Sequence, residues 1–128
     1  MLEDKAKELL SAPNYAVLTT LLPDGQPQTH LVWAGHDGDH VLVNTEVHRQ
    51  KAKNAQRDSR ATVLVFDRND MWSWVEIRGE VVEMVTGQVA RDHIDELANK
   101  YLGVEEYPNP IQSERVILKI APSRQLVR

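Results

Sequence analysis

The stretch that most restricts the fold is residues 71–85, MWSWVEIRGEVVEMV, because its apolar and polar side chains largely alternate. Side chains of an extended strand point to opposite faces in turn, so a period of two predicts one long strand. Gly79 interrupts this strand without a side chain, which predicts a bulge or a close approach of another backbone. One face is expected to carry Met71, Val75, Ile77 and Val81, and the other Trp72, Trp74, Glu76, Arg78 and Glu80.

Five further segments have the composition of strands. YAVLTTLL (15–22) and PQTHLVWAG (27–35) flank PDGQ, and an Asp-Gly turn between two β-rich runs predicts a hairpin. The other apolar or β-branched runs are VLVNT (41–45), ATVLVFD (61–67) and RVILKIAPSRQLV (115–127). About six strands, mostly antiparallel, are therefore expected.

Three segments are predicted to be helical. Residues 2–10 place their apolar side chains on one helical face, which predicts a short first helix. After the strand at 41–45, β-branched residues give way to Arg, Gln, Lys and Ala, which predict a second short helix that runs through Arg57. The longest helix is expected within 86–103, with Thr86 as a possible N-cap and Gly103 just past its end. Its apolar stripe consists of Val89, Ile94, Leu97, Ala98, Tyr101 and Leu102.

These elements predict an α+β fold that is mainly β. Strands in hairpin-like succession suggest an antiparallel sheet that closes, or nearly closes, into a small barrel with helices packed outside. A chain of 128 residues suits one domain, here residues 1–128.

Composition excludes several classes of protein. The formal net charge is -4 and the sequence pI is about 5.7, so non-specific binding to nucleic acid is not expected. Cysteine is absent, which removes disulfides, thiolate nucleophiles and cysteine-based zinc sites. Neither a signal peptide nor a run of membrane-spanning length is visible, and a cytoplasmic location is expected.

Positive charge gathers in residues 44–58, NTEVHRQKAKNAQRD. Backbone N–H groups at the start of a helix favour a bound anion, and Arg49 and Lys51 stand where the predicted helix begins. This segment is chemically suited to hold a phosphate, to which Thr45 could add a hydroxyl. A solvated basic face is the alternative from charge alone. No P-loop or G-x-G-x-x-G pattern is present.

Other polar groupings have simpler interpretations. HDGDH (36–40) offers four metal-ligand types, but a polar hairpin turn explains it and no metal site is predicted. His93 is interpreted as a histidine on the surface of the last helix, and no serine has the context of a hydrolase nucleophile. Trp72 and Trp74 could belong to a half-buried sheet face, or to an interface or ring-binding wall.

Three segments in order resemble a known family. NTEVHRQKAKN followed by RATVLV, together with the strand WVEIRGEV, is similar to the split β-barrel flavin and deazaflavin oxidoreductases related to pyridoxamine 5'-phosphate oxidase. The resemblance covers almost the whole chain and is closest to the branch that uses the deazaflavin coenzyme F420. It implies an FMN-binding-like split β-barrel.

Two departures separate the chain from the pyridoxamine phosphate oxidases themselves. Their second strand normally carries an Arg and then a Lys, whereas THLVWAG has His30 and no Lys. Their C-terminal substrate-binding extension has no counterpart after PSRQLVR. Oxidation of vitamin B6 is therefore not expected.

The resemblance further implies a homodimer with two cofactor sites at the subunit interface. The cofactor would be F420, with FMN as the alternative, and its phosphate-bearing tail would meet the segment around Arg49 and Lys51. Lys53 and Arg57 are spare cations for a polyglutamate tail. The expected cofactor-binding residues are His30, Asn44, Thr45, Arg49, Gln50, Lys51, Asn54 and Trp74, the last from the partner subunit.

Four functions compete at this point. The first is hydride transfer from reduced F420 to an unsaturated or quinone-like acceptor, with chemistry carried by the cofactor. The second places FMN in the same site, and the third is a non-catalytic carrier of such a cofactor. RNA binding through residues 49–60 is a fourth, weakened by the lack of interleaved aromatic residues. No catalytic residue is identified, although His30 and Tyr107 have side chains able to donate a proton.

Overall fold

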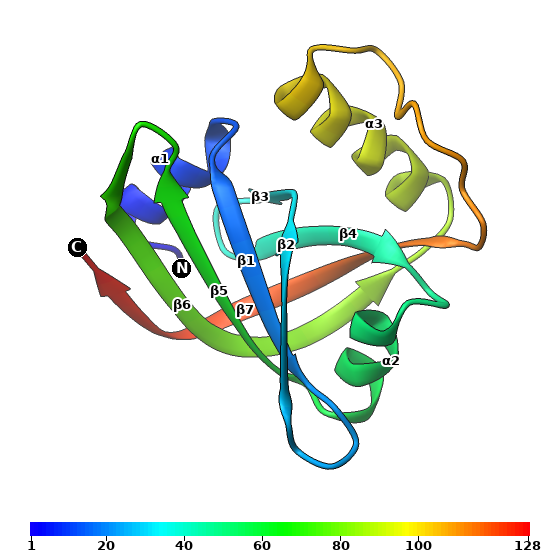
Figure 1. Cartoon of the computed structure of the whole chain (residues 1–128), viewed down its shortest axis with the longest axis horizontal. Helices are drawn as coiled ribbons and strands as arrows, with labels where there is room; N and C mark the ends of the chain where they lie inside the picture. Colours follow the sequence, from blue (N-terminus) through cyan, green and yellow to red (C-terminus); the bar gives the residue numbers. More distant parts are fainter.

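The computed structural model describes residues 1–128, and its strands form one antiparallel sheet in the order β2-β1-β5-β6-β7-β4-β3 (Figure 1). The strands are β1 Tyr15–Leu21, β2 Pro27–Val32, β3 Ala34–His36, β4 Val41–Glu46, β5 Arg60–Asp67, β6 Asp70–Val85 and β7 Arg115–Val127. The helices are α1 Asp4–Ser11, α2 Gln50–Arg57 and α3 Gln88–Leu102. The α+β, mainly β prediction is confirmed.

Trp33 is the point at which the sheet bends back on itself. It alone separates β2 from β3, yet these two strands form opposite edges of the sheet. One residue spans the two edges only if the sheet is strongly curled, which makes the fold a split β-barrel (Figure 1). The single strand expected over 27–35 is therefore wrong, and seven strands replace the six expected.

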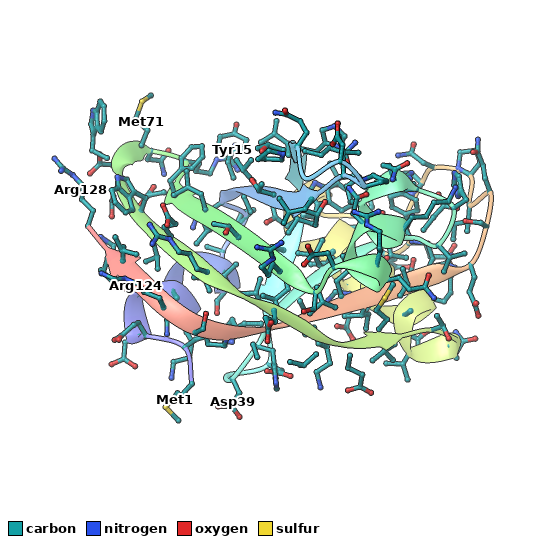
Figure 2. All side chains as sticks on the ribbon, turned by 90° about the horizontal axis from the view of Figure 1, so that it is seen from below. Met1, Tyr15, Asp39, Met71, Arg124 and Arg128 are labelled. Carbon is teal, nitrogen blue, oxygen red and sulfur yellow. The ribbon has the colours of Figure 1, made fainter.

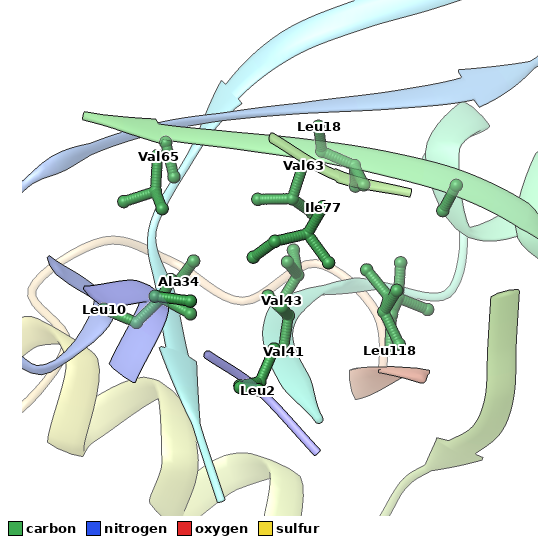
Figure 3. Packing of buried hydrophobic residues seen from close by; sticks show 14 of the residues in the cluster. Leu2, Leu10, Leu18, Ala34, Val41, Val43, Val63, Val65, Ile77 and Leu118 are labelled. Atoms are coloured by element: carbon green, nitrogen blue, oxygen red, sulfur yellow. The ribbon is translucent and has the colours of Figure 1, made fainter. Parts of the chain in front are cut away.

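The core lies inside this curl. Alternate residues of the central strands are buried, among them Leu18, Val63, Val65 and Ile77, and Figure 3 shows them pointing toward one another. The predicted apolar face of α1 is also buried: Leu2, which precedes the helix, and Ala6, Leu9 and Leu10 within it are at most 5% exposed. The period-two and helical patterns therefore identify most of the core.

The close approach predicted at Gly79 is confirmed. The pairing of β6 with β7 shifts register between Arg78 and Gly79. A Cβ atom at position 79 would lie 2.0 Å from the carbonyl oxygen of Ala121, so only glycine fits here without moving backbone. At the start of β6, Figure 2 shows Met71 projecting beyond the turn that joins β5 to β6, and its side chain is exposed, not buried on the face expected for it.

Helix α3 packs on β4 and β7 with a face that differs from the predicted stripe. Val89 and Leu102 are exposed, whereas His93 is buried. The helix starts after Gly87 without a side-chain cap, so the Thr86 cap is wrong, while Gly103 adopts the expected left-handed conformation with φ 72°. None of the three helices combines the length and the apolar character needed to cross a membrane.

Candidate functional site

A pocket of about 360 Å³ opens where the two ends of the curled sheet meet α2 and α3. It brings together four residues expected at a cofactor site, namely Asn44 and Thr45 at the end of β4 and Arg49 and Lys51 at the start of α2. The other lining residues are Tyr15, Ala16, Leu31, Val32, Trp33, Ile94, Tyr101, Tyr107, Asn109 and Arg115. No acidic side chain lines it.

Glu46 organises the charges beside the pocket from a buried position at the end of β4. One carboxylate oxygen accepts hydrogen bonds from the backbone N–H groups of Gln112 and Ser113, both at 2.7 Å. The other oxygen lies 3.2 Å from Arg49 and 3.4 Å from Arg115. Burial alone would raise the pKa of Glu46, but these hydrogen bonds and the two guanidinium groups outweigh it and lower the pKa.

Lys51 has no ion pair or hydrogen-bonded acceptor of its own. Its side chain is half-buried, and burial, followed by the charges of Arg49 and Arg115, lowers its pKa. Three cations thus line the pocket, while Glu46 is the one carboxylate that neutralises them. The pocket retains a surplus of positive charge, which favours an anionic ligand.

Two polar atoms of the pocket residues are buried without a hydrogen-bond partner: the hydroxyl of Thr45, and Nη1 of Arg115, which makes only the 3.4 Å ion-pair contact with Glu46. Arg115 is 4% exposed; its Nε donates to Asn44 at 2.8 Å and its guanidinium lies 5.2 Å from the ring centre of Tyr107. Helix α2 also begins without a side-chain cap. Buried polar atoms are normally satisfied, so these unused donors indicate a ligand site.

Aromatic residues form an apolar wall of the pocket. Trp33 stacks on Tyr101 at 5.3 Å between ring centres and meets Tyr107 edge-on at 6.0 Å. The Tyr101 hydroxyl donates to the carbonyl of Asn14 at 2.9 Å and accepts from the N–H of Ala34 at 3.2 Å. These hydrogen bonds hold Tyr101 against the chain next to Trp33, where the sheet changes edges. The stacked rings offer a flat apolar surface beside the cations.

Behind the pocket, Asn44 connects the cation cluster to α3. Its amide nitrogen donates to the carbonyl of Ala90 at 2.9 Å and to Nδ1 of His93 at 3.0 Å. The interpretation of His93 as a surface histidine is wrong, because it is 8% exposed. Burial, followed by the charges of Lys100 and Arg115, lowers the pKa of His93 to about 4, so the ring is neutral at pH 7 and accepts the Asn44 hydrogen bond.

We expect His93 to make the protein lose stability in acid. In the unfolded chain its pKa returns to about 6.5, so the unfolded state binds the proton more tightly. The stability due to neutral His93 is complete above pH 6.5 and is lost as the pH falls toward 4, by about 3 kcal/mol.

Urea unfolding of wild type and His93→Gln at pH 7 and pH 4 measures this effect. Glutamine retains an oxygen acceptor for Asn44 but does not titrate, so the variant should lose about 3 kcal/mol less than wild type over the same range. Equal losses in both proteins would mean that His93 has an ordinary pKa in the folded state.

The other four residues expected at the cofactor site do not line the pocket. They are His30, Gln50, Asn54 and Trp74. Asn54 is fully buried and donates to Thr20 and Gln28, both at 3.1 Å, while Gln50 donates to Asn54 at 2.8 Å. Together they fasten α2 to the first hairpin. His30 is exposed on the edge strand β2.

Trp74 lies on β6 opposite Phe66, on the sheet face that points away from the core. The two spare cations also lie outside the pocket: Lys53 is exposed, and Arg57 donates to the carbonyl of Leu21. Whether any of these residues contacts a cofactor in an assembled dimer stays a prediction.

Polar groups of the turn at residues 36–40 form hydrogen bonds within the turn and with Ser11 of α1. The Asp37 carboxylate accepts from the backbone N–H groups of Asp39 at 3.0 Å and His40 at 2.8 Å. Nε2 of His36 contacts the hydroxyl of Ser11 at 2.8 Å, and its Nδ1 accepts from the N–H of Gly38 at 3.0 Å. The turn therefore has a structural explanation.

Comparison with known proteins gives consistent similarities. Residues 2–126 match the profile of a family described as pyridoxamine 5'-phosphate oxidase. The structure of an F420 reductase is 27% identical, with a TM-score of 0.84 and 98% of each chain covered. A conserved hypothetical protein, Rv2991, from Mycobacterium tuberculosis is 26% identical, with a TM-score of 0.73 over 98% of this chain and 82% of that chain. A putative pyridoxamine 5'-phosphate oxidase from Listeria innocua, at 20% identity, a TM-score of 0.71 and 99% and 98% coverage, shares the fold.

Proposed function

The chain belongs to the pyridoxamine 5'-phosphate oxidase family, as its sequence motifs predicted, and on that premise we propose that its pocket binds a flavin-type cofactor for hydride transfer. F420 is the first candidate and FMN the second. The acceptor would be an unsaturated or quinone-like organic molecule. The observation that carries this proposal is the set of cations and unused donors beside an aromatic wall.

The residues present fit a phosphate-bearing cofactor. Arg49 and Lys51 would hold the phosphate together with the uncapped start of α2, because charge-assisted donors suit phosphate oxygens. The Thr45 hydroxyl lacks a partner and would donate to the same group. Asn44 would keep Arg115 in place beside them.

The ring system would lie toward the aromatic wall and the apolar lining residues Leu31, Val32 and Ile94. When bound, a flavin or deazaflavin supplies the hydride chemistry. The chain would orient the ring and exclude water. Tyr107 lines the pocket and His30 does not, so Tyr107 is the better candidate for the proton donor.

The similarity to an F420 reductase supports the deazaflavin as first candidate. An FMN-binding reductase and a non-catalytic carrier remain the alternatives, since the same cations and aromatic residues would serve them. A cytoplasmic location, expected from the sequence, stays a prediction.

A second copy of the chain would complete the pocket. Tyr15 and Leu31 line the pocket yet are 48% and 72% exposed. Tyr15 pairs across the strands with Phe66, and Phe66 with Trp74, so a row of aromatic side chains runs across the outer face of the sheet from the rim of the pocket. Such a row is typical of an interface, and Trp74 of a partner would approach the cofactor from it.

Titration of the purified protein with F420 and FMN, followed by fluorescence and absorbance, tests the proposal. We expect F420 to bind more tightly, and reduced F420 then to be oxidised by at least one quinone-like acceptor. Tighter binding of FMN would favour the second candidate, and binding without turnover across a panel of acceptors would indicate a carrier. Failure of both cofactors to bind would refute the proposed function.

A further inference from the structure

The charges of the pocket do not balance for a ligand with a single negative charge. Arg49, Lys51 and Arg115 line it, and the only carboxylate in contact with them is Glu46. Both Glu46 oxygens are already occupied, one by two backbone N–H groups and the other by the two arginines. Two positive charges are therefore left without a counter-charge, which is costly in a partly buried site.

Arg115 is the cation that the phosphate site at the start of α2 does not account for. It enters from β7, its side chain is 3% exposed, and its Nη1 has no hydrogen-bond partner although it lies 3.4 Å from Glu46. The guanidinium is held by Asn44 and by the face of Tyr107. Nη1 thus makes an ion-pair contact with Glu46, an acceptor already shared with Arg49, but no hydrogen bond, so this rigid, buried donor is a preorganised contact for a ligand oxyanion.

We propose that this end of the pocket takes two negative charges, the first on Arg49 and Lys51 and the second on Arg115. The second charge has two possible chemical sources, the second ionisation of a phosphomonoester or a carboxylate next to a phosphodiester. The inference rests on the proposed function, since it concerns the same pocket, and it assigns Arg115 a ligand-binding role. Asn44 and His93 act as positioning residues behind it.

Small anions test this charge requirement without any ring system. An NMR titration would follow the backbone amides of Gln50 and Lys51 at pH 7.5 with methyl phosphate, dimethyl phosphate and a phosphodiester that bears a carboxylate. We expect at least one of the two doubly charged probes to bind about tenfold or more tightly than dimethyl phosphate, because one further charge-assisted hydrogen bond forms. Equal binding of all three probes, or no binding, would overturn the inference.

The arms of this experiment also identify the source of the second charge. Preference for methyl phosphate would indicate a phosphomonoester such as that of FMN, and preference for the carboxylated diester would indicate a tail of the deazaflavin type. In Arg115→Gln the advantage should fall below about threefold, whereas Arg115→Lys should keep part of it. An undiminished advantage in Arg115→Gln would refute the assignment to Arg115.

Wild-type protein alone provides a further test if Arg115→Gln does not fold. The second pKa of a phosphomonoester is about 6, so binding of methyl phosphate should strengthen roughly tenfold from pH 5 to pH 7.5. The groups that face this site are Arg49, Lys51, Glu46, Tyr107 and Arg115, with His93 behind Asn44 and His48 on Ser113. Sulfate stays doubly charged in this range, so it reports titration of the protein itself; an equal change with sulfate would overturn the inference.

Failure of this inference is distinguishable from failure of the proposed function. If the doubly charged anions bind more tightly than dimethyl phosphate but neither F420 nor FMN binds, the role of Arg115 is supported and the proposed function is refuted. If a flavin-type cofactor binds but the small anions bind equally well whatever their charge, the proposed function is supported and the role of Arg115 is refuted.

Discussion

The double variant Arg49→Ala, Lys51→Ala is expected to bind its cofactor about 10²- to 10⁴-fold more weakly than wild type. Each side chain would supply a charge-assisted hydrogen bond worth about 1.5 to 3 kcal/mol, and about 1.4 kcal/mol corresponds to tenfold in affinity. The fold should survive, since Glu46 keeps Arg115 and two backbone donors when Arg49 is removed. Fluorescence titration of both proteins with F420 and FMN measures the loss.

A matched control removes the same charge from the same helix. Lys53→Ala, Arg57→Ala also deletes two cations, but neither of them lines the pocket. We expect its affinity for FMN, which lacks the polyglutamate tail for which these two cations were proposed, to stay within about threefold of wild type, because exposed charges are screened by salt. If both double variants bind equally weakly, the cofactor responds to the general charge of the segment and the assignment to Arg49 and Lys51 is wrong.

Most of the fold was predictable because its elements have strict periods. The alternation of polar and apolar residues along β6 specifies one strand, and the Asp-Gly turn specifies the hairpin of β1 and β2. Gly79, which has no side chain, marks the place where the backbone of β7 comes close. The break at Trp33 was not predictable, because PQTHLVWAG has the composition of one uninterrupted strand. Only the curl of the whole sheet, built from distant strands, requires the chain to change edges there.

The candidate site was predictable only where it is local in sequence. Asn44, Thr45, Arg49 and Lys51 follow one another along the chain, so a single strand-to-helix junction brings them together. Arg115 joins them through the pairing of β7 with β4, in which Thr45 lies opposite Val116 and Glu46 opposite Arg115. A charged residue at the start of the apolar run RVILKI was the one signal in the sequence for it.

The opposite errors at Asn54 and His93 have the same origin. The polar residue Asn54 was expected to face a ligand, but it bonds to Thr20 and Gln28 of a hairpin whose position the sequence does not reveal. His93 was expected at the surface because it precedes the apolar Ile94, yet Asn44 of β4 supplies the partner that makes its burial tolerable. Partners distant in sequence decide both cases.

The network around Glu46 links these observations, since it holds the cations of the site and the loop before β7 in one place. Its Oε1 binds the N–H groups of Gln112 and Ser113, and its Oε2 contacts Arg49 and Arg115. The loop that carries Tyr107 into the pocket is thus anchored at its end by the same carboxylate that spaces the arginines. The ligand site and the fold therefore depend on one buried charge.

Replacement of that charge by Glu46→Gln is expected to destabilise the protein by about 3 to 5 kcal/mol at pH 7. The amide oxygen still accepts the two backbone hydrogen bonds, but buried Arg115 loses its only carboxylate, and an uncompensated buried charge is strongly destabilising. Urea unfolding measures the loss. Glu76→Gln is the matched control, because Glu76 is only partly buried and pairs with the exposed Arg78 on β6, and it should cost no more than about 1 kcal/mol.

The effect of Glu46→Gln should also depend on pH with a definite sign. The pKa of Glu46 is lowered in the folded protein, so its contribution to stability is present above the ordinary glutamate pKa of about 4.3 and is lost as the pH falls through the lower folded value. The difference between wild type and variant should therefore be greatest near neutral pH and shrink below about pH 4. A difference that stays constant down to pH 3 would show that Glu46 is important for its packing and not for its charge, and the two-charge requirement of the pocket would then need another explanation.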